Sequence, residues 1–156
     1  MNDTATLPAP VEQRVRVALA PPDAFDLFTR QMARWWPFAG HSCFDAEARD
    51  VVFEPRIGGV VTELARDGRR MSWGTLTEWS PPGGFAMTWS PGLDASQATL
   101  LQVRFTALEG GGTEVHVHHS GWAARGDQAQ SKRDGYRSGW AAVLGRYVQC
   151  ASGRVS

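Results

Sequence analysis

A single long helical stripe near the C-terminus constrains the fold of this chain more than any other feature. Tyr136, Trp140, Val143, Leu144 and Tyr147 follow one another at helical spacing, so all five side chains lie on one face. The stripe predicts a helix over about residues 128–149. The basic side chains of this segment fall largely away from the centre of that face: Lys132, Arg133, Arg137 and Arg146. A helix with one long apolar face needs a sheet or other helices to cover it.

The covering element is predicted by the region before this helix, which alternates between short apolar runs and turn signals. Asp67–Gly68, Pro81–Gly84 and Gly110–Gly112 are turn sequences that separate segments with the two-residue period of strands. In one such segment, RMSWGTLTEW, the period puts Trp73, Thr75, Thr77 and Trp79 on one face. With a further strand near Val11–Val17, about six to seven antiparallel strands are expected.

A second, shorter helical pattern follows the first expected strand. Pro21 suits a helix start, and Ala24, Leu27 and Phe28 form an apolar stripe. Pro37 ends the pattern. We therefore expect an α+β fold, with a curved antiparallel sheet wrapped around the C-terminal helix and a short helical segment after the first strand. The chain of 156 residues suits a single domain over 11–151, preceded by a flexible arm of residues 1–10.

Composition argues against several classes of function. Lys plus Arg and Asp plus Glu number 16 each, so general binding to nucleic acid or to an acidic membrane is not expected. No apolar stretch approaches the ~20 residues that span a membrane, and the start of the chain lacks a signal-peptide pattern. The two cysteines, Cys43 and Cys150, have no metal or disulfide spacing. A cytoplasmic location is expected.

Known catalytic motifs are missing from the sequence. There is no phosphate-binding glycine loop and no GxSxG nucleophile motif, and no cofactor is expected. His116 and His118 are two residues apart, a spacing that can bind zinc. Because His119 shares its face with two valines, however, His116 and His118 should point to solvent, and no metal site is predicted.

Two ionisable side chains are expected to point inward, and each has two interpretations. His119 is either a core histidine with hydrogen-bonded neighbours or a polar contact to a ligand. Glu63 shares a face with Val61, so it is either an inward carboxylate that serves as a base or ligand contact, or an edge glutamate paired with an arginine. Arg56 is either a residue at the cavity mouth or a solvated loop arginine.

The aromatic residues also have two interpretations, because they either fill one core or line a cavity. The pair Trp35–Trp36 lies at the end of the first helix, beside the expected open end of a cavity between sheet and helix. Gly135 and Gly139, four residues apart, let the last helix approach a neighbour or leave room for a guest. The candidate ligand-binding residues are Trp35, Trp36, Phe38, His41, Glu63, Trp73, Met87, Trp89, His119, Tyr136 and Trp140.

Several stretches together resemble a known family. They are AFDLFT, MARWWPF and HS near residues 24–42, then VVFEPRIGG, WGTLTEW, MTW, HSGW and GYRSGWAAVLGRY. This set is similar to the activator of Hsp90 ATPase homologue-like family, in the START-like (SRPBCC, birch-pollen-allergen-like) helix-grip superfamily, over about residues 11–150. The resemblance implies a helix-grip fold with a hydrophobic cavity. It also implies relatives that bind lipids, sterols, polyketides or hormones, a few of them cyclases or dehydratases.

Three functions are compatible with these observations. The first is binding of a hydrophobic or aromatic small molecule in the cavity. The second is an enzyme of the cyclase or hydrolase type that uses Glu63 or His119 as acid or base. The third is a chaperone-associated regulator, which the resemblance brings in. The co-chaperones of that family carry an additional N-terminal domain, and only about ten residues precede the first expected strand here. A homodimer is left open.

Overall fold

One curved antiparallel sheet forms the body of the protein. The computed structural model describes residues 8–153, and its seven strands lie in the order β1-β7-β6-β5-β4-β3-β2. All neighbouring strands are antiparallel. The strands are β1 (Val11–Val17), β2 (Ala48–Phe53), β3 (Val60–Ala65), β4 (Arg70–Ser80), β5 (Gly84–Trp89), β6 (Thr99–Ala107) and β7 (Thr113–Ser120).

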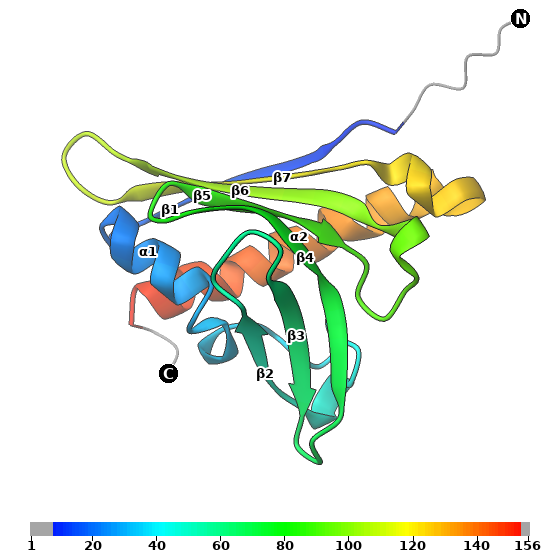
Figure 1. The fold of residues 1–156 in the computed structure, drawn as a ribbon. Coiled ribbons are helices and arrows are strands. Elements are labelled where there is room, and N and C mark those ends of the chain that lie inside the picture. Colours follow the sequence, from blue (N-terminus) through cyan, green and yellow to red (C-terminus); the bar gives the residue numbers. More distant parts are fainter. Residues whose placement is uncertain (1–7, 154–156) are drawn as a thin grey trace, which may run out of the picture.

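The C-terminal helix α2 (Ala129–Ala151) runs along the inner face of the sheet, as Figure 1 shows. The predicted stripe is confirmed, because Trp140, Val143, Leu144 and Tyr147 are all buried. The expected helix-grip α+β architecture is therefore the observed one. A short 3₁₀ turn, η4 (Trp122–Gln128), connects β7 to this helix.

The bend of the sheet is concentrated in β4, which joins β5 on one side and β3 on the other (Figure 1). The pairing register shifts opposite β3 and again between Leu76 and Glu78. Gly74 has a φ of 148°, and a Cβ built there would lie 1.8 Å from the Thr88 carbonyl oxygen. Only glycine fits this approach between the two strands.

These bulges make one prediction from the sequence wrong. Strict alternation puts Thr75 and Thr77 on the face of Trp73, but both threonines are exposed and Leu76 is buried instead. Each register shift moves the following side chains to the other face of the strand. The two-residue period therefore fails in β4.

The first helix is also shorter than its apolar pattern predicts. Helix α1 spans Pro21–Phe28 and is followed only by a 3₁₀ turn, η1 (Met32–Arg34). The Trp35 indole Nε1–H donates to the Leu27 carbonyl at 2.8 Å. This hydrogen bond folds Trp35 back onto α1 and into the core.

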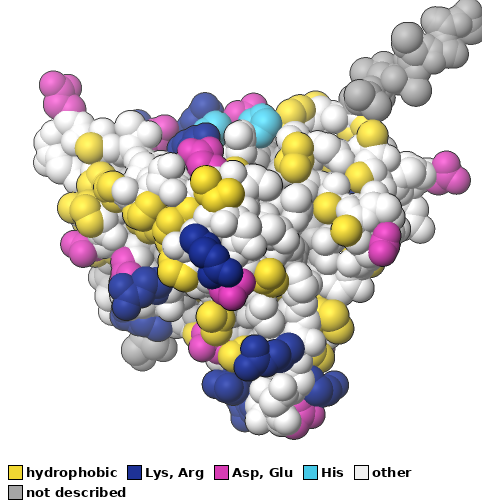
Figure 2. Space-filling view, viewed as in Figure 1, with side chains coloured by type: hydrophobic (Ala, Val, Ile, Leu, Met, Phe, Trp, Pro, Cys, Tyr) yellow, Lys and Arg dark blue, Asp and Glu magenta, His cyan; other side chains and the backbone are white. Residues whose placement is uncertain are grey.

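The outer face of the sheet carries paired charges. Arg104 makes two hydrogen bonds with the Glu78 carboxylate, at 2.7 and 3.0 Å. His116 and His118 are partly exposed there while His119 is fully buried, as the alternation predicts. Acidic and basic side chains are interspersed on the face shown in Figure 2. That face has no single-sign field of the kind that attracts nucleic acid.

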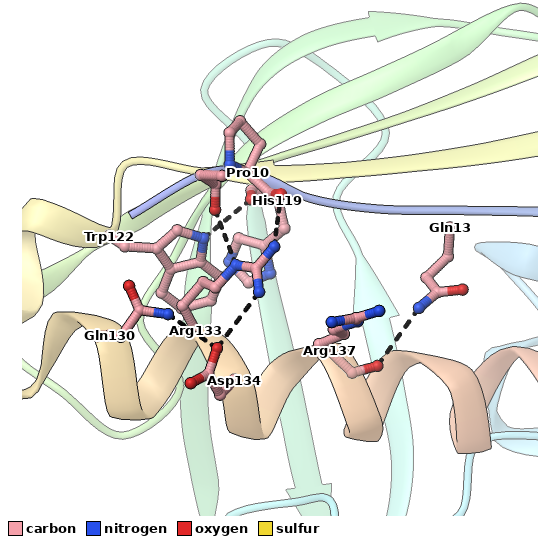
Figure 3. Close-up of polar contacts among 9 residues, drawn as sticks. Pro10, Gln13, His119, Trp122, Gln130, Arg133, Asp134 and Arg137 are labelled. Carbon is pink, nitrogen blue, oxygen red and sulfur yellow. Dashed lines mark hydrogen bonds and ion pairs between the residues drawn. The ribbon is translucent and has the colours of Figure 1, made fainter. Parts of the chain in front are cut away.

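The N-terminal arm that the sequence predicts lies largely outside the described residues, since residues 1–7 are not among them. Its last residues contact α2 through the Arg133 guanidinium. Arg133 donates to the carbonyl oxygens of Ala9 and Pro10 at 2.9 and 3.2 Å (Figure 3).

Candidate functional site

A cavity of about 550 Å³ lies between the N-terminal half of α2 and the inner face of β4 and β5. The segment 40–43, which leads from the first helix to β2, closes one side of it. The residues that line the cavity are Trp36, Gly40, His41, Ser42, Cys43, Trp73, Trp89, Pro91, Ser131, Lys132, Gly135, Tyr136, Gly139, Trp140 and Val143.

Four tryptophans form most of the apolar wall. Trp36 lies 5.0 Å from Trp73 between ring centroids, and Trp73 lies 5.2 Å from Trp89. Trp140 contacts Trp89 and Trp36 at 5.7 and 5.9 Å. The rings are tilted or edge-on to each other rather than stacked. All four are at most 6% exposed, so they pack on one another and border the cavity with a small part of their surface.

Gly135 and Gly139 of α2 line the cavity and leave space there, because glycine has no side chain. A Cβ on Gly135 would meet no atom within 4 Å, and one on Gly139 would only touch His41 at 3.9 Å. Of the two interpretations of this spacing, the structure supports room for a guest. Glycine inside a helix costs about 1 kcal/mol relative to alanine, so the space has an energetic cost.

Polar side chains also line the cavity, among them Ser42 and Ser131. The Tyr136 hydroxyl oxygen accepts a hydrogen bond from the Trp89 indole Nε1–H at 3.0 Å. An indole N–H can only donate, so the tyrosine O–H proton is left to donate elsewhere. Lys132 and His41 also line the cavity. This set suits an apolar ligand with one or two polar groups.

Glu63 is buried on the inner face, as one of its two interpretations predicts, but no arginine pairs with it. Its carboxylate accepts hydrogen bonds from the backbone N–H groups of Cys43 and Phe44 at 2.8 and 2.7 Å. It also accepts one from the Trp73 indole at 2.7 Å. Three donors therefore occupy the carboxylate, and Glu63 of β3 ties the segment at Cys43 and Phe44, called the cavity loop below, to β3 and β4.

The thiol of Cys43 lines the cavity beside this carboxylate. Burial, with the nearby Glu63 charge, raises the pKa of Cys43 to about 12. The thiolate is the reactive form of cysteine. Cys43 is therefore protonated at neutral pH and does not suit a role as nucleophile.

His119 is a core residue with both ring nitrogens engaged. The Trp140 indole donates to its Nδ1 at 3.0 Å, so the neutral ring carries its hydrogen on Nε2. That hydrogen is directed at the Thr99 hydroxyl, 2.7 Å away. Burial, helped by the charge of Arg125, lowers the pKa of His119 to about 3. The first interpretation, a satisfied core histidine, therefore describes it.

The candidate ligand-binding residues divide into two groups. Trp36, His41, Trp73, Trp89, Tyr136 and Trp140 line the cavity, whereas Trp35, Phe38, Glu63, Met87 and His119 do not. Trp35 packs on Phe28 and Tyr147 instead. Glu63 and His119 are both saturated by hydrogen bonds and lie behind the wall. An acid–base role for these two residues, expected from the sequence, is not supported by this geometry. Arg56 forms an exposed ion pair with Glu54 and is not in the lining.

Lys132 is a lining residue that the sequence analysis missed. It precedes Tyr136 by one helical turn, so the stripe extends to it. The sequence placed Lys132 away from the centre of the apolar face, and Lys132 is exposed as expected, but its stem can lie along the apolar lining while its ammonium group reaches solvent at the mouth.

Residues 8–153 contain neither a candidate metal site nor a helix that could cross a membrane. No three His, Cys, Asp or Glu side chains gather there in a way that could hold a metal ion. No described helix is long and apolar enough to cross a membrane.

Together, the curved sheet, the long helix and the aromatic cavity between them define a helix-grip α+β protein. A family model described as Activator of Hsp90 ATPase homolog 1-like protein matches residues 18–151, and the chain belongs to this family. No functionally curated protein matches the chain significantly.

Several solved structures resemble this chain, at different levels of sequence identity. An anthrahydroquino-gamma-pyrone synthase, Txn09, is 31% identical, with a TM-score of 0.57, and the match covers 80% of this chain and 84% of that one. The Aha1 dimer from Colwellia psychrerythraea is 15% identical over 92% and 96% of the chains, with a TM-score of 0.66. CalU16 from Micromonospora echinospora is 16% identical over 94% and 76%, with a TM-score of 0.64. The last two support the fold alone.

Proposed function

We propose that the protein binds a hydrophobic or aromatic small molecule in the cavity between α2 and the sheet. The observation that carries this proposal is a cavity of about 550 Å³ with a wall of four tryptophans. Small-molecule sites are typically concave and mostly apolar, with a few placed polar groups. The polar side chains that a ligand would meet are those of His41, Ser42, Cys43, Ser131, Lys132 and Tyr136.

A second candidate, an enzyme acting on the same ligand, is favoured by one comparison. The relative at 31% identity is described as a synthase. Chemistry in this chain would have to use groups that reach the cavity. The Tyr136 hydroxyl as proton donor and the His41 imidazole as base fit that requirement, and they replace Glu63 and His119 in this role.

A chaperone-associated role and a homodimer stay as lesser proposals. Within residues 8–153, the exposed large apolar side chains are Val52, Ile57, Leu93 and Leu100. A dimer is described for the Colwellia psychrerythraea relative. We also propose a cytoplasmic location, on the composition alone.

Native mass spectrometry of gently purified protein, compared with its denatured mass, tests the main proposal. Gly139→Leu fills the cavity, while Gly145→Leu adds the same side chain on the exposed part of α2, where no atom lies within 4 Å. We expect a non-covalent added mass on the wild type and on Gly145→Leu, lost in Gly139→Leu.

Two results would contradict the proposal. One is an added mass that Gly139→Leu retains in full, which would put the ligand elsewhere. The other is a clean apo mass together with no change in tryptophan fluorescence across a panel of lipids and aromatic acids, amides and ketones. That result would favour the chaperone-associated role instead.

A further inference from the structure

We infer that the ligand carries a carboxylate, held on the α2 side of the cavity by Lys132 and the Tyr136 hydroxyl. This inference rests on the proposed function and deepens it by naming the chemical class of the ligand: an aromatic or polycyclic acid. Its grounds are the distribution of charge around the cavity and the free proton of one hydroxyl group.

The charge that lines the cavity is positive. Among the described lining residues, Lys132 is the only side chain that is charged throughout the physiological pH range. The neighbouring carboxylate of Asp134 is engaged elsewhere, since Arg133 and Gln130 contact it at 3.3 and 2.9 Å (Figure 3). Within residues 8–153, no carboxylate forms an ion pair with Lys132. Lys132 is an exposed residue of the lining, so the carboxylate of a bound ligand can reach its ammonium group without competition from a carboxylate of the described chain.

A second cation stands behind Tyr136 on the same side. Arg125 is only 8% exposed, and its guanidinium carbon lies 5.9 Å from the centre of the Tyr136 ring. It donates to the carbonyls of Gln97 and Trp89 at 2.8 and 3.3 Å, and no carboxylate pairs with it in the described part of the chain. A buried cation without an ionic partner makes its surroundings favourable for an anion.

The one buried acid near the cavity is on the other side. Glu63 lies behind Cys43 and Trp73, on the loop and sheet side, with its oxygens already accepting three N–H groups. Its negative charge opposes an anion there. The two sides of the cavity therefore differ in sign, and a ligand with one acidic end would bind in one orientation.

The donors available match a carboxylate. Lys132 supplies one ammonium group, and Tyr136 supplies an O–H whose oxygen is already fixed by the Trp89 indole. A carboxylate has two oxygens, and charge-assisted hydrogen bonds to both are the strongest that these donors can form.

The test uses two probes of the same shape and different charge, anthraquinone-2-carboxylate and anthraquinone-2-carboxamide. Binding is followed by quenching of tryptophan fluorescence. We expect the wild type to bind the acid about three- to tenfold more tightly than the amide. Raising the salt concentration should narrow that ratio, because exposed charges are screened.

Three variants test which residue causes the preference for the acid over the amide. Lys132→Met should bring the ratio close to one, and Lys132→Arg should largely restore it. Arg137→Met is the matched control: it removes one positive charge from the same helix at a residue that does not line the cavity (Figure 3). That variant should keep the wild-type ratio.

The outcomes separate this inference from the proposed function. If acid and amide bind equally well, or if Arg137→Met acts like Lys132→Met, the carboxylate inference is overturned while small-molecule binding stands. If neither probe quenches the tryptophans of any variant, the inference of an aromatic or polycyclic acid is overturned, and the native mass measurement decides separately on the proposed function.

Discussion

The two halves of α2 face the same sheet, but the C-terminal half packs into a closed core whereas the N-terminal half borders the cavity. In the C-terminal half, Leu144 and Tyr147 are buried, and Tyr147 packs on Trp35 and Phe28 at 4.9 and 5.2 Å. The Tyr147 hydroxyl also donates to the Ala24 carbonyl at 2.8 Å. Helix α1 lies over this half in Figure 1. This end of the molecule is a closed core.

In the N-terminal half, the stripe continues with the large residues Tyr136 and Trp140, but Gly135 and Gly139 lie beside them and leave the space of the cavity unfilled. The comparison teaches that side-chain volume along one helix face decides where a helix-grip fold is solid and where it is hollow. The following predictions test that difference, from the largest expected effect to the smallest.

The largest effect is expected from Phe28→Ala in the packed half. Phe28 is 1% exposed and contacts Trp35, Phe85 and Phe105 as well as Tyr147. Its removal should lower the free energy of unfolding by about 3–5 kcal/mol. Urea unfolding of this variant beside Tyr136→Phe measures the contrast, because the second change should cost less than about 1 kcal/mol. Equal losses would mean that the two halves are packed alike.

A smaller effect is expected where the cavity loop is held. Glu63→Gln replaces an oxygen acceptor by an amide donor that faces the N–H groups of Cys43, Phe44 and Trp73. We expect a loss of about 1–3 kcal/mol from the unpaired donors. Amide hydrogen exchange should speed up at Cys43 and Phe44 more than in the C-terminal half of α2. Uniform speeding in both regions would contradict a local role.

The next prediction concerns His119, which accepts the hydrogen bond of the Trp140 indole, and the pH dependence of the free energy of unfolding. His119 has a pKa of about 3 in the folded protein against an ordinary value of 6.5, so between these values only the unfolded chain binds the proton. Its contribution to stability is complete above pH 6.5. It falls by about 1.4 kcal/mol per pH unit as the pH drops from 6.5 toward 3.

Unfolding free energies at several pH values check this slope. His119→Gln should be less stable at pH 7 but should lose stability less steeply on acidification. Identical slopes in the variant and the wild type would show that His119 is not the group responsible.

The smallest effect on stability is expected from filling the cavity beside the N-terminal half of α2, called the hollow half below. Gly139→Leu and Gly145→Leu both remove a helix glycine, which favours the helix by up to about 1 kcal/mol. Because the cavity receives the new side chain at residue 139, both variants should be as stable as the wild type or slightly more stable. Thermal unfolding measures this. A loss of 1–3 kcal/mol in Gly139→Leu alone, as typical of overpacking, would mean that the space is already filled.

The sequence predicts the framework well and the partners of its polar residues poorly. The stripe on α2, the strand alternation and the inward direction of His119 and Glu63 follow from periods that backbone geometry imposes. The bulges of β4 break that period, and their signal, Gly74, is visible only once Thr88 is known to approach it.

The site itself could be predicted only in part. Tyr136 and Trp140 belong to the helical stripe, but the spacing of Gly135 and Gly139 is equally compatible with close packing and with a cavity. Glu63 binds backbone N–H groups of a loop, and such partners leave no mark on side-chain patterns. These long-range contacts require the folded chain.

The most direct test of the hollow half uses the indole N–H signals of the seven tryptophans in a nitrogen–proton NMR spectrum, assigned with single Trp→Phe variants. On titration with anthraquinone-2-carboxylate, the signals of Trp36, Trp73, Trp89 and Trp140 should shift most. Those of Trp35 and Trp79, which pack against the α1 end of the core, should stay nearly still. Shifts centred on Trp35 or Trp79, with the cavity tryptophans unchanged, would contradict the account.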